Sequence, residues 1–121
     1  MSDTFPLALV IEDDDKLSEI FTQALKAANY EVEAIKDGDL ACQFLASGSP
    51  SLIVLDLHLP NVSGDTILKY IQEQAHLAET KVILATADPQ MAETLQDSSE
   101  LVLIKPVSFS QLRDLALRFH S

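Results

Sequence analysis

The sequence predicts an α/β fold, in which a parallel sheet of five strands is doubly wound by helices in a (βα)5 arrangement. Five short apolar runs rich in β-branched residues recur along the chain, and segments with helical periodicity separate them. Strands that alternate with helices need crossover connections, which make neighbouring strands parallel. Three of the runs are too apolar to leave one face in water, so helices are expected on both faces of the sheet.

The third apolar run is the most informative strand, because it ends on the carboxylate of Asp56. An unpaired charge in a dry core is costly, so Asp56 is expected at the end of its strand rather than inside it. The other runs are read as strands from their β-branched side chains. We expect strands over residues 7–11, 31–35, 51–56, 81–86 and 101–104.

Helices are predicted between these strands from apolar residues that recur at three- and four-residue spacing. The first, over residues 17–28, is the clearest because six apolar side chains fall on one face. The segment 89–97 is the weakest, since only Met91 and Leu95 support it, and its helix is expected to be short. The apolar residues of the remaining predicted helices, together with the six of the first, are Leu17, Ile20, Phe21, Ala24, Leu25 and Ala28; Leu40, Ala41, Phe44 and Leu45; Ile67, Leu68, Ile71 and Ala75; and Leu112, Leu115, Ala116 and Phe119.

Composition and charge limit the classes of function. The chain has 121 residues, the size of one domain, with 47% apolar residues and a formal net charge of -11. This acidic balance would repel nucleic acid and anionic membranes, so neither is expected as a direct partner. Cys42 is the only cysteine, which excludes an internal disulfide. With no basic leader and no long apolar stretch, we expect a soluble cytoplasmic protein whose partners are proteins or cations.

Polar side chains follow the predicted strands at one edge of the sheet. All strands of a parallel sheet end on the same side, which is where ligands bind. Glu12 and Asp13 follow the first strand, and Asp56 ends the third. Thr86 ends the fourth strand, and Lys105 follows the fifth. Three carboxylates, a hydroxyl and an ammonium group are therefore expected to converge.

The charge of this cluster predicts a cation site. Carboxylates about 5 Å apart at an effective dielectric constant of about 20 repel each other by roughly 3 kcal/mol per pair. The Lys105 ammonium and a divalent cation together would balance three carboxylates, and oxygen ligands suit Mg²⁺. A carboxylate beside Mg²⁺ and an ammonium is also a competent nucleophile for phosphoryl transfer. The sequence thus predicts that Asp56 becomes an aspartyl phosphate at a Mg²⁺ site.

Four motifs, in this order, resemble the receiver domain of two-component response regulators. They are VIEDDD at residues 10–15, VLDLHLPNVSG at 54–64, ATA at 85–87 and IKP at 104–106. The resemblance covers residues 7–119. It implies a flavodoxin-like, CheY-like sheet of strand order 2-1-3-4-5, in a single receiver domain over residues 1–121.

The resemblance implies a role for each acidic residue of the cluster. Asp56 would be the phosphoacceptor, Asp13 a direct metal ligand, and Glu12 a partner acting largely through metal-bound water. The backbone carbonyl of His58 would complete the protein ligands. Its side chain is not expected to bind metal, because no second histidine lies at ligand spacing, and the ring is expected to face solvent. Asp14 and the following aspartate are read as residues of a helix N-terminus.

The resemblance also assigns Thr86 and Lys105 to phosphoryl oxygens and implies a cis bond between Lys105 and Pro106. Two departures concern the switch. Receivers usually place Tyr or Phe three residues before the lysine, where its ring moves inward on phosphorylation, but this chain has Val102 there. Thr86 and Lys105 are only 19 residues apart, a few fewer than is usual. Output is therefore expected through Thr86, the loops or the fourth helix.

The predicted function is that of a phosphoacceptor in a phosphorelay. Asp56 would take a phosphoryl group from a sensor histidine kinase or a histidine phosphotransfer protein and signal to a downstream protein effector. The domain would catalyse only its own phosphorylation and dephosphorylation, so it is not expected to be an enzyme for a separate substrate. The alternative is a receiver-like interaction module that acts without phosphorylation. An FMN carrier fits less well, because EDDD would repel the FMN phosphate. A haloacid dehalogenase-type phosphatase also fits less well, because its nucleophile would follow the first strand, whereas Asp56 lies in the third.

Overall fold

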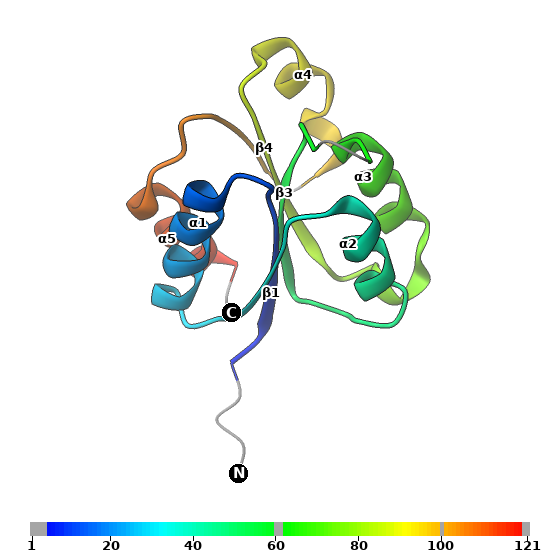
Figure 1. Ribbon diagram of the computed structural model, residues 1–121, viewed down its shortest axis with the longest axis horizontal. Coiled ribbons are helices and arrows are strands. Elements are labelled where there is room, and N and C mark those ends of the chain that lie inside the picture. Colours follow the sequence, from blue (N-terminus) through cyan, green and yellow to red (C-terminus); the bar gives the residue numbers. More distant parts are fainter. Residues whose placement is uncertain (1–4, 60–61, 100, 120–121) are drawn as a thin grey trace.

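The structure, a computed structural model, describes residues 5–59, 62–99 and 101–119. Its centre is a five-stranded parallel sheet with helices on both faces (Figure 1). The strand order is β2-β1-β3-β4-β5, so the predicted (βα)5 fold and its order are confirmed. The strands are β1 (Leu7–Ile11), β2 (Glu31–Ile35), β3 (Leu52–Asp56), β4 (Lys81–Thr86) and β5 (Leu101–Ile104).

The helices form two layers, one on each face of the sheet (Figure 1). Helices α1 and α5 lie side by side on one face, and α2 and α3 cover the other. The short α4 lies beyond the carboxyl end of β4. Among the described helices, none has both the length and the apolar character that a bilayer span would need. The helices are α1 (Asp15–Ala27), α2 (Gly38–Leu45), α3 (Gly64–Glu73), α4 (Pro89–Thr94) and α5 (Phe109–Arg118).

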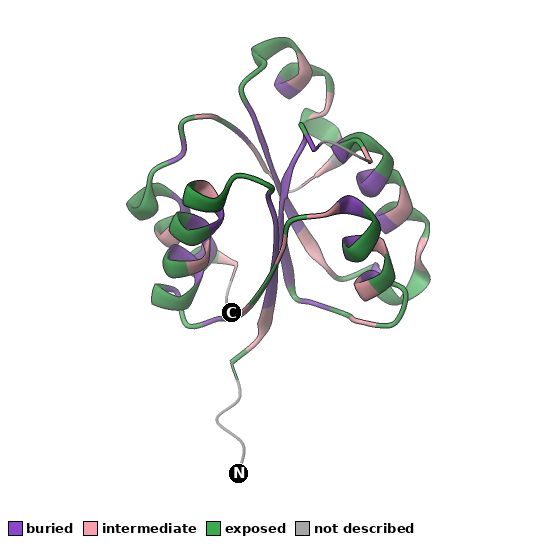
Figure 2. Ribbon diagram, viewed as in Figure 1, coloured by how far each residue is buried: buried purple, intermediate pink, exposed green. Residues whose placement is uncertain are grey.

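The apolar core is divided into two by the sheet, because successive side chains of a strand point to opposite faces. Val10 packs with Phe21 and Leu112 in one cluster, which we call the α1/α5 layer. Leu9 packs with Ile67 in the other cluster, the α2/α3 layer. Figure 2 shows buried residues along the strands and the inward faces of the helices, with exposed residues on the outward faces.

The register of the sheet aligns the strand ends that carry polar residues. Asp56, the last residue of β3, pairs with Ala85 of β4. Ile11, the last residue of β1, pairs with Leu55 of β3. Glu12 therefore leaves β1 at the level where Asp56 ends its own strand.

Side chains cap the N-terminus of every helix whose bounds are given above. Each cap has extended backbone dihedrals and accepts a hydrogen bond from a backbone N–H of the first turn, which satisfies one of the free donors of the helix end. Asp14 caps α1 in this way, as predicted, through the N–H of Leu17. The remaining caps are Asp37 on α2, Ser63 on α3, Asp88 on α4 and Ser108 on α5.

The structure departs from the predicted helices at a few positions. Ile20 and Leu40 belong to the predicted apolar faces, yet they are 39% and 54% exposed. Each lies at the margin of a face whose other members are sufficient to cover the sheet. Ala75 falls in a separate 3₁₀ helix, Ala75–Leu77, rather than in α3. The predicted short fourth helix is confirmed, since α4 has six residues and a 3₁₀ turn, Gln96–Ser98, follows it.

Gly64 allows α3 to begin directly against the end of β3. A Cβ atom at this position would lie 2.4 Å from Leu57 Cα and 2.8 Å from the Asp56 carbonyl oxygen. The Gly64 N–H also donates a hydrogen bond to the Leu57 carbonyl at 3.2 Å. Glycine at position 64 thus permits the close approach of α3 to the backbone of Asp56 and Leu57.

Candidate functional site

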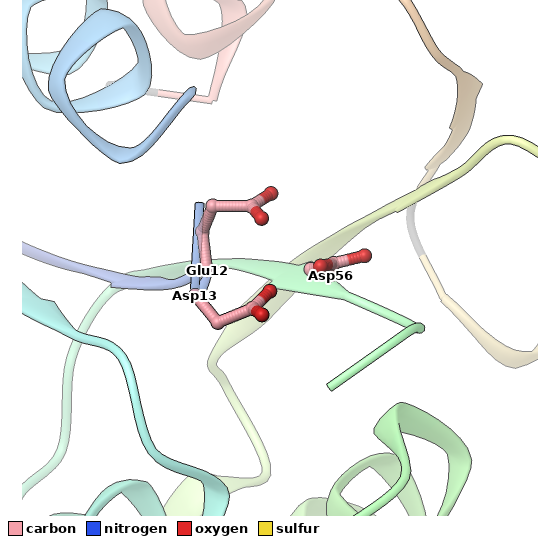
Figure 3. Close-up of side chains that lie close together, drawn as sticks. All are labelled: Glu12, Asp13 and Asp56. Carbon is pink, nitrogen blue, oxygen red and sulfur yellow. The ribbon is translucent and has the colours of Figure 1, made fainter. Parts of the chain in front are cut away.

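The carboxyl edge of the sheet brings the predicted acidic residues together. Glu12 and Asp13 follow β1, and Asp56 ends β3. One carboxylate oxygen from each of the three lies within 4.8 Å of the others, and their side chains point toward a common space (Figure 3). Glu12 is 1% exposed and Asp56 is 2% exposed, whereas Asp13 is exposed. The sheet therefore holds two buried acids and one accessible acid around a single point.

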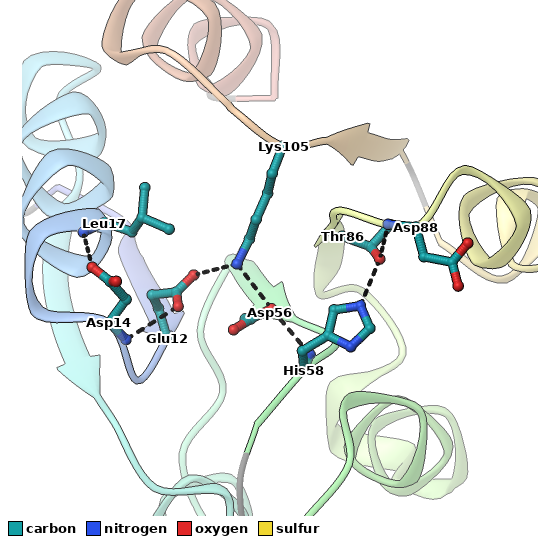
Figure 4. A network of polar contacts seen from close by, with 8 residues as sticks. All are labelled: Glu12, Asp14, Leu17, Asp56, His58, Thr86, Asp88 and Lys105. Carbon is teal, nitrogen blue, oxygen red and sulfur yellow. Dashed lines mark hydrogen bonds and ion pairs between the residues drawn. The ribbon is translucent and has the colours of Figure 1, made fainter.

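Lys105 supplies the positive charge expected from the sequence. Its Nζ lies 3.1 Å from Asp56 Oδ1 and 3.3 Å from Glu12 Oε1 (Figure 4). Its backbone N–H donates a hydrogen bond of 2.7 Å to the carbonyl of Thr86, which ties the loop after β5 to the end of β4. The side chain is 19% exposed, so the ammonium is shielded from most of the solvent. Lys105 thus bridges the two buried acids.

The surroundings of Glu12 and Lys105 change the pKa values of these two groups. Burial, together with the charge and hydrogen bonding of Asp56, raises the pKa of Glu12 from 4.5 to about 7. Burial alone would lower the pKa of Lys105, but its contacts with Asp56 and Glu12 outweigh this and raise the pKa above its usual value. Lys105 is therefore charged at neutral pH, while Glu12 titrates near it.

The cluster fits a hard divalent cation. Its three donors are all carboxylate oxygens, which Mg²⁺ prefers. Glu12 Oε1 is buried and, although Lys105 is near, it has no hydrogen-bond partner among the described residues. Glu12 Oε2 accepts a hydrogen bond of 3.2 Å from the Asp14 N–H. The Lys105 ammonium is thus the one positive group near Glu12 Oε1 among the described residues, and a cation held by the three acids would add a second.

Thr86 ends β4 as predicted, but its partners were not foreseen from the sequence. Its Oγ1 accepts a hydrogen bond from the Asp88 N–H at 3.0 Å. His58 is exposed, as predicted, but its Nε2 also lies 3.0 Å from the same oxygen (Figure 4). The only sequence signal for this contact is that His58 and Thr86 follow neighbouring strands. The His58 N–H also donates to Asp56 Oδ1 at 3.0 Å.

Comparison with known proteins identifies the family. The sequence model of the family "response regulator receiver domain" matches residues 8–117 of the chain. The chain belongs to this family. Receiver domains are components of two-component response regulators, so the chain is a module of that signalling system.

The relatives of this receiver domain agree with its fold. The transcriptional regulatory protein HprR of Escherichia coli K12 is 33% identical over 86% of the chain and 47% of its own length. A signal receiver domain assigned to a Luxo repressor protein of Vibrio parahaemolyticus is 31% identical, with 94% and 91% of the two chains covered and a TM-score of 0.81. The chemotaxis regulator CheY4 of Vibrio cholerae, 22% identical over 96% and 99%, has a TM-score of 0.86 and shows the shared fold. The chain spans less than half the length of the curated relatives it matches.

Two details of this receiver domain bear on the features expected around its lysine. The bond between Lys105 and Pro106 is cis, as the resemblance implied. Val102 is half-buried and packs against the α2/α3 layer, beside residues that include Met91 and Leu95 of the α4 region. Val102 thus contributes to packing at the position where receiver domains usually have a tyrosine or phenylalanine ring.

Proposed function

We propose that this receiver domain accepts a phosphoryl group on Asp56 from the phosphohistidine of a sensor histidine kinase or a histidine phosphotransfer protein. The observation that most supports this is the position of the Asp56 carboxylate. It is buried at the end of a core strand, 3.1 Å from Lys105 Nζ, and shares a space with Glu12 and Asp13. Such an acid is held in place and partly neutralised, as a nucleophile in phosphoryl transfer needs to be.

The proposed transfer exchanges one bond to phosphorus for another. A carboxylate oxygen of Asp56 attacks the phosphorus, and the bond from phosphorus to the donor imidazole nitrogen breaks, with its electron pair leaving on the donor. Lys105 would neutralise charge on the phosphoryl oxygens, and Thr86 would donate its hydroxyl proton to one of them. Hydrolysis of the aspartyl phosphate then returns Asp56 and releases inorganic phosphate. The domain acts only on itself in this scheme.

Glu12, Asp13, Asp56 and the backbone carbonyl of His58 would hold Mg²⁺ in this proposal. The all-oxygen donor set and the burial of Glu12 and Asp56 support the assignment. When bound, Mg²⁺ supplies positive charge that offsets the carboxylates and the phosphoryl oxygens. Glu12 would bind the metal as the ionised carboxylate, since that is the form in which a carboxylate is a metal ligand.

The proposal extends to the setting of the domain. We place it in the cytoplasm, treat residues 1–121 as one receiver domain and expect its output to pass to a downstream protein effector. No direct contact with nucleic acid or membrane is proposed, because the net charge of -11 opposes both. Candidate upstream partners are proteins that carry a phosphorylated histidine.

The proposal is tested by the intact mass of the protein after incubation with acetyl phosphate and Mg²⁺. We expect one added phosphoryl group on the unmodified sequence, none on Asp56→Asn, and none when EDTA removes the metal. Asn keeps the size of Asp56 but removes its nucleophilic oxygen. If the protein gains no phosphoryl group under any of these conditions, the interaction module that acts without phosphorylation becomes the better explanation.

A further inference from the structure

The Thr86 hydroxyl is held by two groups that lie outside the acidic cluster. Asp88 donates its N–H to Thr86 Oγ1, and His58 Nε2 contacts the same oxygen, each at 3.0 Å. Thr86 is fully buried. Figure 4 shows the His58 ring extending from β3 toward Thr86, while its backbone N–H reaches Asp56. Among the described residues, Thr86 Oγ1 makes no hydrogen bond with the Asp56 carboxylate or the Lys105 ammonium.

The bonding capacity of a hydroxyl makes this arrangement exclusive. A hydroxyl has one proton and two lone pairs, and the Asp88 N–H uses one lone pair. The His58 ring takes either the second lone pair or the proton, depending on its tautomer. A phosphoryl oxygen can only accept, so it must receive the Thr86 proton. If the ring accepts the Thr86 proton, the hydroxyl cannot also donate that proton to a phosphoryl oxygen, so donation to the phosphoryl group breaks the contact with His58. The proposed exchange applies to this tautomer, in which Nε2 is the acceptor.

We propose that His58 is a positioning residue that holds Thr86 in the unphosphorylated protein, and that transfer of Thr86 from His58 to the phosphoryl group releases the imidazole. This inference rests on the proposed phosphorylation of Asp56. Val102 has no ring that could move on phosphorylation, whereas the His58 side chain has one. The backbone N–H of His58 also donates a hydrogen bond to Asp56. His58 therefore contacts Asp56 through its backbone N–H and Thr86 through its ring.

The same exchange reaches α4 through Asp88. The Asp88 N–H is bound to Thr86 Oγ1, and the Asp88 side chain caps α4 by accepting from the N–H groups of Gln90 and Met91. A shift of Thr86 thus removes a hydrogen bond from the residue that starts α4. The residue that caps α4 therefore loses a contact together with the His58 ring.

The test measures the affinity of the domain for fluoroberyllate in the presence of Mg²⁺, with the complex serving as a probe of the phosphoryl group. His58→Leu removes both ring nitrogens at similar size. We expect it to bind fluoroberyllate about threefold to tenfold more tightly, because one resting-state hydrogen bond no longer has to break. His58→Gln, whose amide can donate or accept, should return the affinity toward that of the unmodified protein.

A double-mutant cycle separates the contact from other effects of the substitution. In a Thr86→Ala background the contact does not exist, so His58→Leu should leave fluoroberyllate affinity unchanged. Unchanged or weaker binding by His58→Leu, or an equal gain in the Thr86→Ala background, would overturn the inference. Because His58 is exposed, its substitution should not impair folding, and urea unfolding of each variant checks this.

The outcomes also distinguish this inference from the proposed function. If the unmodified protein neither binds fluoroberyllate nor gains a phosphoryl group, the phosphoacceptor function fails and the inference with it. If the unmodified protein does both and His58→Leu behaves identically, only the inference is wrong. Amide hydrogen exchange adds a direct readout, because the Asp88 N–H should exchange faster once fluoroberyllate is bound to the unmodified protein.

Discussion

Glu12 shows how burial turns a common acidic residue into a sensitive part of the site. Glu12 is the first of several acidic residues that follow β1. Its side chain is buried near Asp56 and Lys105, whereas Asp13 and Asp14 are exposed. Burial favours the neutral acid, and the nearby Asp56 charge acts in the same direction. The free energy of unfolding of the metal-free protein should therefore depend on whether Glu12 carries a proton.

The pH dependence of stability follows from this shift. The pKa of Glu12 is about 7 in the folded protein, compared with 4.5 for the ordinary side chain. The folded state therefore binds the proton more tightly, so its contribution to stability is complete below pH 4.5 and is lost as the pH rises through about 7. We expect the metal-free protein to have a lower free energy of unfolding at pH 8 than at pH 6, measured by urea titration.

Glu12→Gln is the matched control for this titration. Glutamine keeps the size of the side chain and is neutral at every pH. The difference in stability between pH 6 and pH 8 should therefore be smaller in this variant than in the unmodified protein. An equal difference in both proteins would mean that other groups cause the pH dependence. Saturating Mg²⁺ should also reduce it in the unmodified protein, because metal binding favours the ionised carboxylate.

At the scale of the elements, the junction between β3 and α3 is the most constrained part of the site. Gly64 begins α3 where its missing Cβ would meet the backbone of Leu57 and Asp56. We expect Gly64→Ala to lower the free energy of unfolding by about 2 kcal/mol or more, because backbone atoms cannot move away as a flexible side chain can. Urea unfolding measures this loss, and reduced phosphorylation should accompany it.

Gly38→Ala provides the comparison, because Gly38 also begins a helix, α2. A Cβ there would lie 2.8 Å from Val62 Cβ and 3.3 Å from the Val62 carbonyl oxygen. Both substitutions gain the same intrinsic helix propensity. The loss at position 38 should be the smaller one, and a loss as large as that at position 64 would contradict the proposed role of the Leu57 and Asp56 backbone.

Helix α4 is the least supported helix, and its structure explains why the sequence signal for it was weak. It has six residues, of which Ala92 is buried, and Pro89 and the Asp88 cap define its start. Short helices gain little from internal hydrogen bonding, so tertiary contacts and the cap hold them. An element of this kind is suited to respond when the hydrogen bond between Thr86 and Asp88 changes.

For the molecule as a whole, Mg²⁺ should act as a stabilising ligand. A ligand that binds only the folded state adds about 2.7 kcal/mol at 100 times its dissociation constant. We therefore expect Mg²⁺ to raise the melting temperature of the unmodified protein. Asp13→Asn should raise the stability of the metal-free protein by about 1 kcal/mol, because it removes one of three neighbouring negative charges, and should reduce the effect of Mg²⁺.

Asp14→Asn is the control for this metal effect. It removes the same charge from the adjacent position, while asparagine retains the ability to cap α1. Its response to Mg²⁺ should stay close to that of the unmodified protein, as measured by thermal unfolding with and without the metal. If Mg²⁺ does not change the melting temperature of the unmodified protein, the proposed metal site is wrong.

The sequence predicted the sheet and the acidic cluster because both depend on chain order. Parallel strands must end at one edge, which predicts that Asp56 lies beside Glu12. The contact between His58 and Thr86 depends on loop conformation and side-chain rotamers, which periodicity does not encode. Burial of Ile20 and Leu40 was wrong because an apolar stripe can be wider than the surface it covers. The predicted helix caps needed only local chemistry, and Asp14 confirmed it.

The division of the core by the sheet has a consequence for protein engineering. The residues that contact α4 belong to the α2/α3 layer, whereas Phe21, Leu25 and Leu112 lie in the α1/α5 layer on the other face. Repacking the α1/α5 layer therefore offers a way to adjust thermal tolerance without altering the contacts beneath α4. A library of variants confined to that layer would serve as a set of scaffolds with different thermal stability and the same α4 surface.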